Sequence, residues 1–285
     1  MQIQQSMKKK LLVLIAVLCM GIEVHAQFTY GTSGLLNMPT GEMQRDKTFL
    51  CGFGFLENHT TPARWTYDTW NYYINITIFP WMEVAYTCTL HKAMAVDPAY
   101  GAGFWVPSTY GKFVNQDRNF SLRLRLWKEG WWKSWTPQIV IGGNDCLNNS
   151  WTEGSKIAMS DAKMNGFYSR YYVAVTKHFS FERFGELGAH AAYVYNKRHD
   201  YPLNGPCFGA NFNFDLPRSN FWTKLASGVN VMAEYDSMTL NAGMEYAIMD
   251  AISPRLAKKV EVNAMMEMNR CKYWSGGLMF KVHLK

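Results

Sequence analysis

Apolar and polar residues alternate along most of this chain, in segments of about ten residues. In one of them Phe120 and Leu122 fall on one side, whereas Ser121 and Arg123 fall on the other. A period of two places successive side chains on opposite faces of a β-strand. The pattern predicts about twelve strands, with ten or fourteen as alternative counts. The expected strands cover residues 47–57, 68–79, 81–92, 117–127, 136–145, 166–179, 184–196, 205–215, 228–235, 237–248, 258–268 and 271–284.

These predicted strands are long. Many run nine to twelve residues, whereas strands of globular proteins average about five or six and a tilted membrane strand needs about 9–11. Backbone groups inside a bilayer must all be hydrogen-bonded, and closing the sheet removes its unpaired edges. We therefore predict an all-β fold, a closed antiparallel transmembrane β-barrel over residues 47–285. An exported soluble β-sandwich would show the same alternation and stays open as an alternative.

Ionisable residues occupy the second face of several predicted strands, which suits the wet interior of a barrel. The candidates for lumen-facing positions are Arg123, Arg125, Glu83, His190, Glu234, Glu261 and Glu267. Two interpretations stay open. Either these charges neutralise one another and fill the lumen, or Arg123 and Arg125 line a path for an anionic polymer such as a capsular chain.

Aromatic residues collect near the ends of the predicted strands. Rings with an apolar body and a polar tip prefer the headgroup level of a membrane, where barrels carry aromatic girdles. The girdle candidates are Trp70, Trp81, Trp127, Trp131, Trp132 and Trp135. A sandwich core and a sugar-stacking platform are the alternative interpretations of these tryptophans.

The first 26 residues have the pattern of a secretory signal peptide. Lysines 8–10 precede an apolar run over 11–22, and Val24 and Ala26 are small residues at the −3 and −1 positions of a cleavage site. Beyond this segment no stretch approaches the roughly 18 apolar residues of a transmembrane helix. We therefore expect export to the outer membrane, with its lipid as a partner.

Residues 27–46 precede the first predicted strand and are rich in turn chemistry. Gly31 and Gly34 permit a positive φ, and Pro39 interrupts regular strand pairing. No Gly-x-x-x-x-Gly-Lys-[Ser/Thr] motif follows, so a phosphate-binding loop is excluded. The segment is expected to be a periplasmic lead-in or a plug for the lumen.

Charge and motifs give little support to an enzyme or a nucleic-acid binder. The whole-chain net charge is +7, and without the predicted signal peptide 26 basic and 21 acidic side chains leave +5, which is mild and spread out, without a Lys/Arg block of the kind that grips nucleic acid. Gly-x-Ser-x-Gly and His-Glu-x-x-His motifs are absent, and the seven histidines never pair at i, i+4. Five dispersed cysteines follow the predicted signal peptide and form neither a disulfide framework nor a zinc site. We predict no enzymatic activity and no cofactor or metal, although a Ser–His pair on neighbouring strands could escape a search by spacing.

Several short motifs, in order along the chain, are similar to those of one family. They are 34–40 (Gly-Leu-Leu-Asn-Met-Pro-Thr), 117–121 (Asp-Arg-Asn-Phe-Ser), 126–130 (Leu-Trp-Lys-Glu-Gly), 142–145 (Gly-Gly-Asn-Asp) and 233–236 (Ala-Glu-Tyr-Asp). Together they resemble the YjbH-like outer-membrane proteins of exopolysaccharide and group 4 capsule operons. The motif residues singled out are Gly31, Gly34, Pro39, Asp117, Arg118, Glu129, Gly130, Asp145, Glu234 and Asp236.

The resemblance implies a non-enzymatic outer-membrane barrel that serves secretion or surface assembly of an exopolysaccharide or capsule. It also implies polysaccharide and other polysaccharide-export proteins as partners. A porin-like or accessory barrel is one alternative, and an exported β-sandwich that binds glycans is another.

Overall fold

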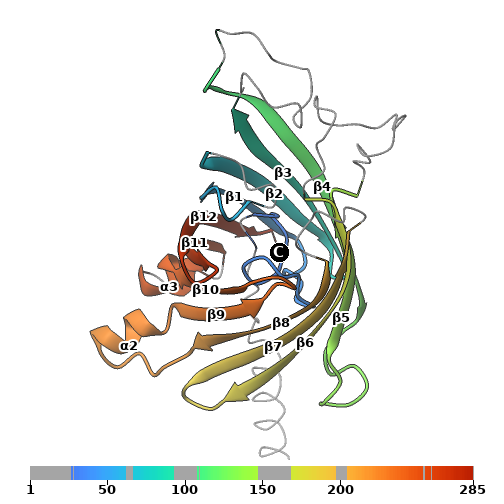
Figure 1. Ribbon diagram of the computed structural model, residues 1–285. Coiled ribbons are helices and arrows are strands. Elements are labelled where there is room, and N and C mark those ends of the chain that lie inside the picture. Colours follow the sequence, from blue (N-terminus) through green and yellow to red (C-terminus); the bar gives the residue numbers. More distant parts are fainter. Residues whose placement is uncertain are drawn as a thin grey trace, which may run out of the picture.

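Twelve strands of the described chain form one closed ring in the computed structural model (Figure 1). The structure describes residues 27, 29–61, 67–92, 108, 110–146, 168–196, 204–252, 254–257 and 259–284. The predicted signal peptide over 1–26 lies outside them. The strands are β1 (Thr48–Leu56), β2 (Thr69–Phe79), β3 (Met82–Lys92), β4 (Phe113–Trp127), β5 (Gln138–Asn144), β6 (Arg170–Phe181), β7 (Gly185–Tyr195), β8 (Gly205–Phe214), β9 (Val229–Tyr235), β10 (Leu240–Ala247), β11 (Val260–Asn269) and β12 (Tyr273–His283).

Each strand pairs antiparallel with the next, and β1 also pairs with β12. Thr48 lies opposite His283 and Phe55 opposite Gly276 in that closing pair. The predicted closed antiparallel barrel is therefore confirmed, and the β-sandwich alternative is wrong, because the sheet has no free edge.

Local contacts explain where strand boundaries differ from the prediction. β4 begins at Phe113 rather than at 117, because its first residues pair with Leu90, His91 and Lys92 at the end of β3. β10 begins at Leu240 rather than at 237. There the carboxylate of Asp236 accepts the backbone N–H groups of Met238 and Thr239, which forms a turn before the strand.

The described chain contains three short helices that the sequence did not predict. They are α2 (Phe221–Ala226) between β8 and β9, and α3 (Ile248–Ile252) and α4 (Pro254–Ala257) between β10 and β11. Among the described residues, no helix has the length and apolar character needed to cross a bilayer.

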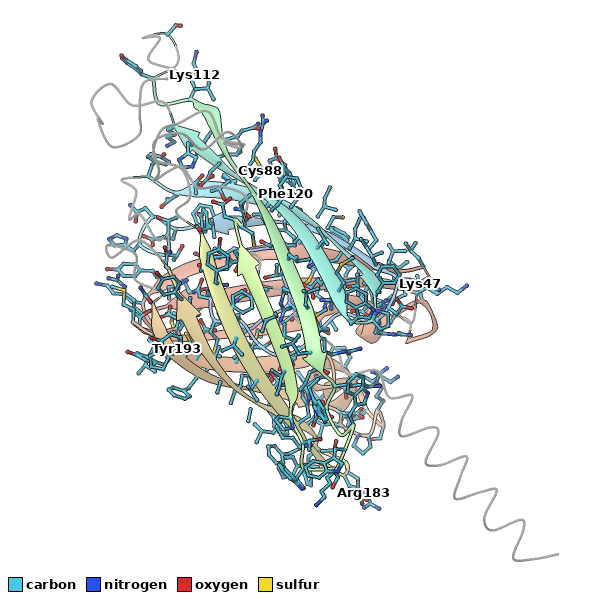
Figure 2. All side chains as sticks on the ribbon, turned by 90° about the vertical axis from the view of Figure 1, so that its right-hand side faces the viewer. Lys47, Cys88, Lys112, Phe120, Arg183 and Tyr193 are labelled. Atoms are coloured by element: carbon cyan, nitrogen blue, oxygen red, sulfur yellow. The ribbon has the colours of Figure 1, made fainter. Side chains whose placement is uncertain are left out.

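The two ends of the barrel differ. Successive strands run in alternate directions, so the links β2–β3, β4–β5, β6–β7, β8–β9 and β10–β11 share one end with the start of β1 and the finish of β12. We call this the hairpin end, and the opposite one the loop end. Figure 2 shows Lys47 and Arg183 at the hairpin end, and Lys112 and Tyr193 toward the loop end.

The barrel is apolar outside and polar inside, which inverts the usual order of a globular protein. On β2, the outward residues are all 39–46% exposed: Trp70, Tyr72, Ile74, Ile76 and Ile78. The alternate residues are buried and mostly polar: Asn71, Tyr73, Asn75 and Thr77. The apolar outer face is removed from water only if another apolar surface covers it.

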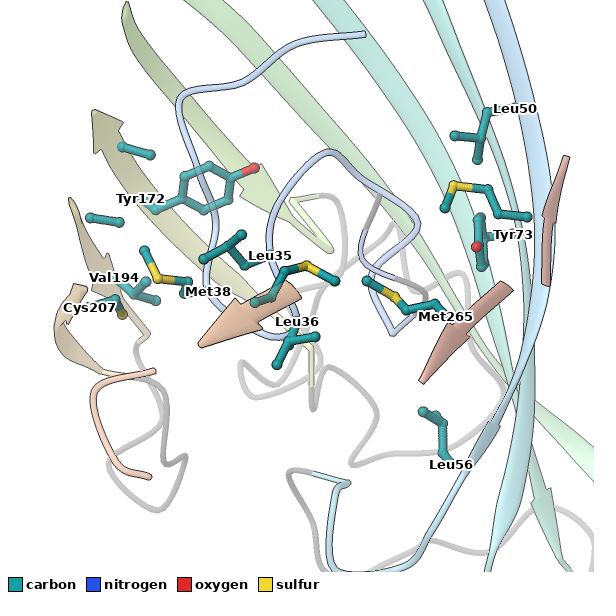
Figure 3. Close-up of a cluster of buried hydrophobic side chains, with 14 residues drawn as sticks. Leu35, Leu36, Met38, Leu50, Leu56, Tyr73, Tyr172, Val194, Cys207 and Met265 are labelled. Carbon is teal, nitrogen blue, oxygen red and sulfur yellow. The ribbon is translucent and has the colours of Figure 1, made fainter. Parts of the chain in front are cut away.

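The lumen is filled by the N-terminal segment. Residues 29–44, called the plug from here on, are buried throughout. Leu35, Leu36 and Met38 of the plug belong to a cluster with inward side chains of the wall, among them Tyr172 and Met265 (Figure 3). The buried apolar core therefore lies between the plug and the strands.

Two inward-facing glycines provide room for the apolar side chains of the plug. A Cβ atom at Gly209 in β8 would lie 2.5 Å from Cδ1 of Leu35 and 2.7 Å from Sδ of Met38. A Cβ atom at Gly243 in β10 would lie 2.5 Å from Cδ2 of Leu36. All three distances are below any normal contact, so a larger residue at either position would displace the apolar side chains of the plug.

We expect Gly209→Val to destabilise the plugged barrel by roughly 1–3 kcal/mol, the range for overpacking a filled core. The measurement is the temperature at which the folded band disappears in semi-native gel electrophoresis. Ala210→Val is the matched control, because Ala210 is the next residue and faces outward. Equal melting temperatures for both variants would contradict the close fit of the plug.

Candidate functional site

The plug is held by a wall carboxylate that binds its backbone. Glu234 in β9 accepts three consecutive N–H groups, from Leu36 at 3.0 Å, Asn37 at 2.7 Å and Met38 at 3.1 Å. The segment turns sharply here, since Leu35 N–H also donates to the Met38 carbonyl. A turn leaves its N–H groups without strand partners, and a buried N–H without a partner is costly. Glu234 supplies the missing acceptors.

The side chain of Asn37 extends the same contact to β11. Its amide nitrogen donates to Glu267 at 2.5 Å and to Asn269 at 2.8 Å. Asn241 of β10 donates to both Glu234 and Asp236. This side of the lumen therefore binds the plug through acceptors on β9 and β11, and Asn241 on the strand between them donates to the β9 carboxylate.

The opposite wall contributes a cation. Arg170 in β6 donates to the Asn37 carbonyl at 2.7 Å, to Oε1 of Gln27 at 3.1 Å and to Asn144 at 2.6 Å. Its guanidinium also lies 3.5 Å from the ring centroid of Tyr30. Asn37 is thus held from both sides, with its N–H bound by a carboxylate and its carbonyl by a guanidinium. Arg170 was not singled out from the sequence.

A buried ion pair fixes both halves of the plug. Arg123 and Glu83 approach to 3.2 Å, and both side chains are 0% exposed. Glu83 accepts the backbone N–H and the hydroxyl of Ser33, each at 2.7 Å, while Arg123 also donates to the Thr40 carbonyl. Breaking a buried pair of this kind is far more costly than breaking an exposed one.

His190 lies in a hydrogen-bonded chain that crosses three strands. Its Nδ1 is 2.8 Å from Oγ1 of Thr176 and its Nε2 is 2.8 Å from Oδ1 of Asn211. A hydroxyl, an imidazole and an amide in this order resemble an activated nucleophile. However, Thr176 is fully buried and its hydroxyl accepts the backbone N–H of Gly41. The arrangement therefore secures the plug.

The plug also contacts the hairpin end of the barrel. His178 in β6 is hydrogen-bonded to Glu42 at 3.2 Å and to Glu129 at 2.7 Å. Glu129 belongs to the β4–β5 link, where Gly130 adopts a φ of 71°. Burial alone would raise the pKa of Glu129, but hydrogen bonds from His178 and Lys177 outweigh it, so that its pKa lies below the ordinary value.

The other two lumen candidates lie apart from these plug contacts. Arg125 is half-buried, and its backbone N–H donates to the Trp81 carbonyl. Glu261 pairs with Lys281 at 3.0 Å and with His283 at 2.6 Å, on neighbouring strands of the wall. The sequence analysis had placed both among the lumen-facing candidates, together with the residues that bind the plug.

The glycines and the proline singled out near the N-terminus shape the plug. Gly31 has a φ of 67°, and a Cβ atom there would lie 2.7 Å from Oγ1 of Thr87 and from Cβ of Tyr73. Gly34 and Pro39 form an isolated β-bridge that closes the turn held by the wall. Only glycine fits the position of Gly31 without displacing the strands.

The remaining motif residues have separate positions. Asp117 is buried on the inward face of β4, whereas Arg118 is exposed on its outward face. Asp145 follows β5 with a φ of 52°, and Asp236 caps the β9–β10 turn. The motifs therefore do not form one site. Among the described residues, no group of His, Cys, Asp and Glu could hold a metal ion.

All six girdle candidates are exposed on the outside of the barrel, by 36–67%. Trp70 lies at the loop end of β2. The hairpin end carries Trp81, Trp127, Trp131, Trp132 and Trp135. Their role as a membrane girdle stays a prediction.

The sequence matches the model of a protein family, and its fold is distantly similar to solved structures. A family model described as "Exopolysaccharide biosynthesis protein YbjH" matches residues 26–196. The uncharacterized lipoprotein YjbH of Escherichia coli K12 is 29% identical over 121 residues, which are 42% of this chain and 14% of that protein. The match thus spans a small part of that relative.

Two solved structures overlap with most of the chain. The outer membrane phospholipase A of Escherichia coli covers 84% of this chain and 96% of its own, at 10% identity and a TM-score of 0.34. The Salmonella typhi outer membrane phospholipase dimer with bound calcium covers 83% and 90%, also at 10% identity and a TM-score of 0.34. Likeness at this level says nothing about activity.

We expect Glu234→Gln to loosen the plug, because one acceptor oxygen and the negative charge are lost. A hydrogen bond to a charged group contributes about 1.5–3 kcal/mol, so a loss of about 2 kcal/mol would speed amide exchange roughly thirtyfold. The measurement is hydrogen exchange at residues 36–38. Glu245→Gln is the control, since Glu245 is also buried but bonds to Asn263 of the wall. Unchanged protection in Glu234→Gln would contradict the role of Glu234 in holding the plug.

Proposed function

Because this chain belongs to the family of exopolysaccharide biosynthesis proteins that matches residues 26–196, we propose that it is a non-enzymatic outer-membrane β-barrel. We further propose that it acts in secretion or surface assembly of an exopolysaccharide or capsule. Polysaccharide and other export proteins are its proposed partners. The proposal is carried by family membership together with a closed barrel whose lumen is filled.

The outer face supports the location in a membrane. Large apolar side chains such as Ile76, Leu122 and Val173 point away from the barrel and are exposed. Soluble monomers rarely expose a continuous apolar surface of this size, whereas the lipid-facing band of a barrel is built in this way. Aromatic residues at both ends of the strands agree with the same placement.

The filled lumen favours an accessory or assembly role over that of a general pore. Arg123, for which a path for an anionic polymer was one of two open interpretations, is engaged by Glu83 and by the plug. A polymer would reach it only after the plug had left. We therefore propose that the barrel works in its plugged form beside a separate export channel.

The enzymatic alternative gains no support from the one described arrangement that resembles an activated nucleophile. In the described chain, the hydroxyl–imidazole–amide chain at Thr176, His190 and Asn211 is buried behind the plug. A nucleophile must reach its substrate, and this hydroxyl does not reach the surface. The proposed role is accordingly one of binding and assembly.

The test is deletion of the gene from its bacterium, followed by quantification of surface polysaccharide. We expect the deletion to reduce it and the intact gene to restore it. Each complemented strain is checked for a heat-modifiable band in its outer-membrane fraction. Polysaccharide unchanged by the deletion would reject the role in secretion, and a protein found only in the periplasm would reject the membrane barrel.

A further inference from the structure

The helix α2 makes few contacts with the other helices and strands of the described chain. None of its six residues is buried, and Phe221 and Trp222 are 69% and 73% exposed. Asn220 and Thr223 form a capping box that sets where the helix begins. Figure 1 shows α2 projecting beyond the ends of β8 and β9. Because so short a helix is marginal in water without packing, its apolar side chains indicate a missing contact surface.

Other links at the hairpin end expose large apolar side chains in the same way. Trp131, Trp132 and Trp135 in the β4–β5 link, Phe184 in the β6–β7 link and Ile252 in α3 are all 62–71% exposed. They belong to three different links of the hairpin end, between β4 and β11, rather than to one link. An extended apolar layer such as a bilayer leaflet can cover side chains spread over several links.

Basic side chains accompany these aromatic residues. The links 128–137, 182–184 and 215–227 contain five basic residues: Lys128, Lys133, Arg183, Arg218 and Lys224. The exposed acidic residues in the same links are Glu182 and Asp215, because Glu129 is half-buried and bound to Lys177 and His178. Nζ of Lys133 also lies 4.8 Å from the ring centroid of Trp132.

This ring is continuous with the apolar outer face. Phe179 and Phe181 on β6 and Trp127 at the end of β4 are exposed on the outward face directly before the links begin. Aromatic residues followed by Lys and Arg form the usual order from hydrocarbon to headgroup. Here the outward aromatic residues lie at the ends of the strands, and the Lys and Arg residues lie in the links that follow.

We propose that the hairpin end binds the headgroup layer of a leaflet that contains anionic phospholipid. In this arrangement α2 lies in the plane of the headgroups, with Phe221 and Trp222 at the boundary of the acyl chains. Arg218 and Lys224 contact lipid phosphates, as in other interfacial amphipathic helices. The inference rests on the proposed membrane location and adds a lipid-binding surface to it.

The experiment uses the mature chain folded into vesicles whose lipids carry bromine on the upper acyl carbons. Bromine quenches only nearby tryptophan. The emission of Trp222 is obtained as the difference between the wild type and Trp222→Phe. Trp70, on the outward face of β2, is measured in the same way with Trp70→Phe and reports on the barrel itself. Vesicles are phosphatidylcholine alone or with phosphatidylglycerol.

We expect both tryptophans to be quenched, and Trp222 more strongly when phosphatidylglycerol is present. The double variant Arg218→Gln with Lys224→Gln should abolish that dependence on anionic lipid. If Trp70 is quenched and Trp222 is not, the inference is overturned, while the location of the barrel in the membrane stands. That result would also be the one expected if α2 instead bound a protein partner. Quenching of neither tryptophan would overturn the proposed membrane location as well.

Discussion

Hydrogen bonds from the inner wall to the backbone of the plug are the interactions on which this structure depends. A buried segment without strand partners must find acceptors and donors elsewhere. Here a carboxylate at Glu234 binds the N–H groups of the turn, and guanidinium groups at Arg170 and Arg123 bind its carbonyls. The charges of the lumen are therefore used to bind the chain's own N-terminal segment.

This use of charge explains how a polar interior coexists with a packed core. Leu35, Leu36 and Met38 carry apolar surface into the barrel and cover inward-facing glycines and small side chains. Polar side chains of the wall in turn form hydrogen bonds with the backbone N–H and C=O groups of the same segment. A barrel of about twelve strands lies between those filled by side chains alone and those with open channels, and here the buried plug occupies the lumen.

The sequence predicted the strands well because their period of two is a local property, and closure followed from the need to pair edges. The partners of the plug are set by contacts between residues up to 232 positions apart, which no local pattern shows. Arg170, Thr176 and Asn211 were therefore missed as a group, although alternation places each on an inward face. The helix α2 was missed because its six residues are too few to show a helical period.

The central claim is that the plug closes the barrel, and electrical conductance tests it most directly. The protein without residues 1–26, inserted into a planar lipid bilayer, should show no steady ion current at moderate voltage. If the plug loosens transiently, the current should show only rare and brief openings of the barrel. A continuous current of the size expected for an unobstructed barrel, carried by the intact chain, would contradict the account.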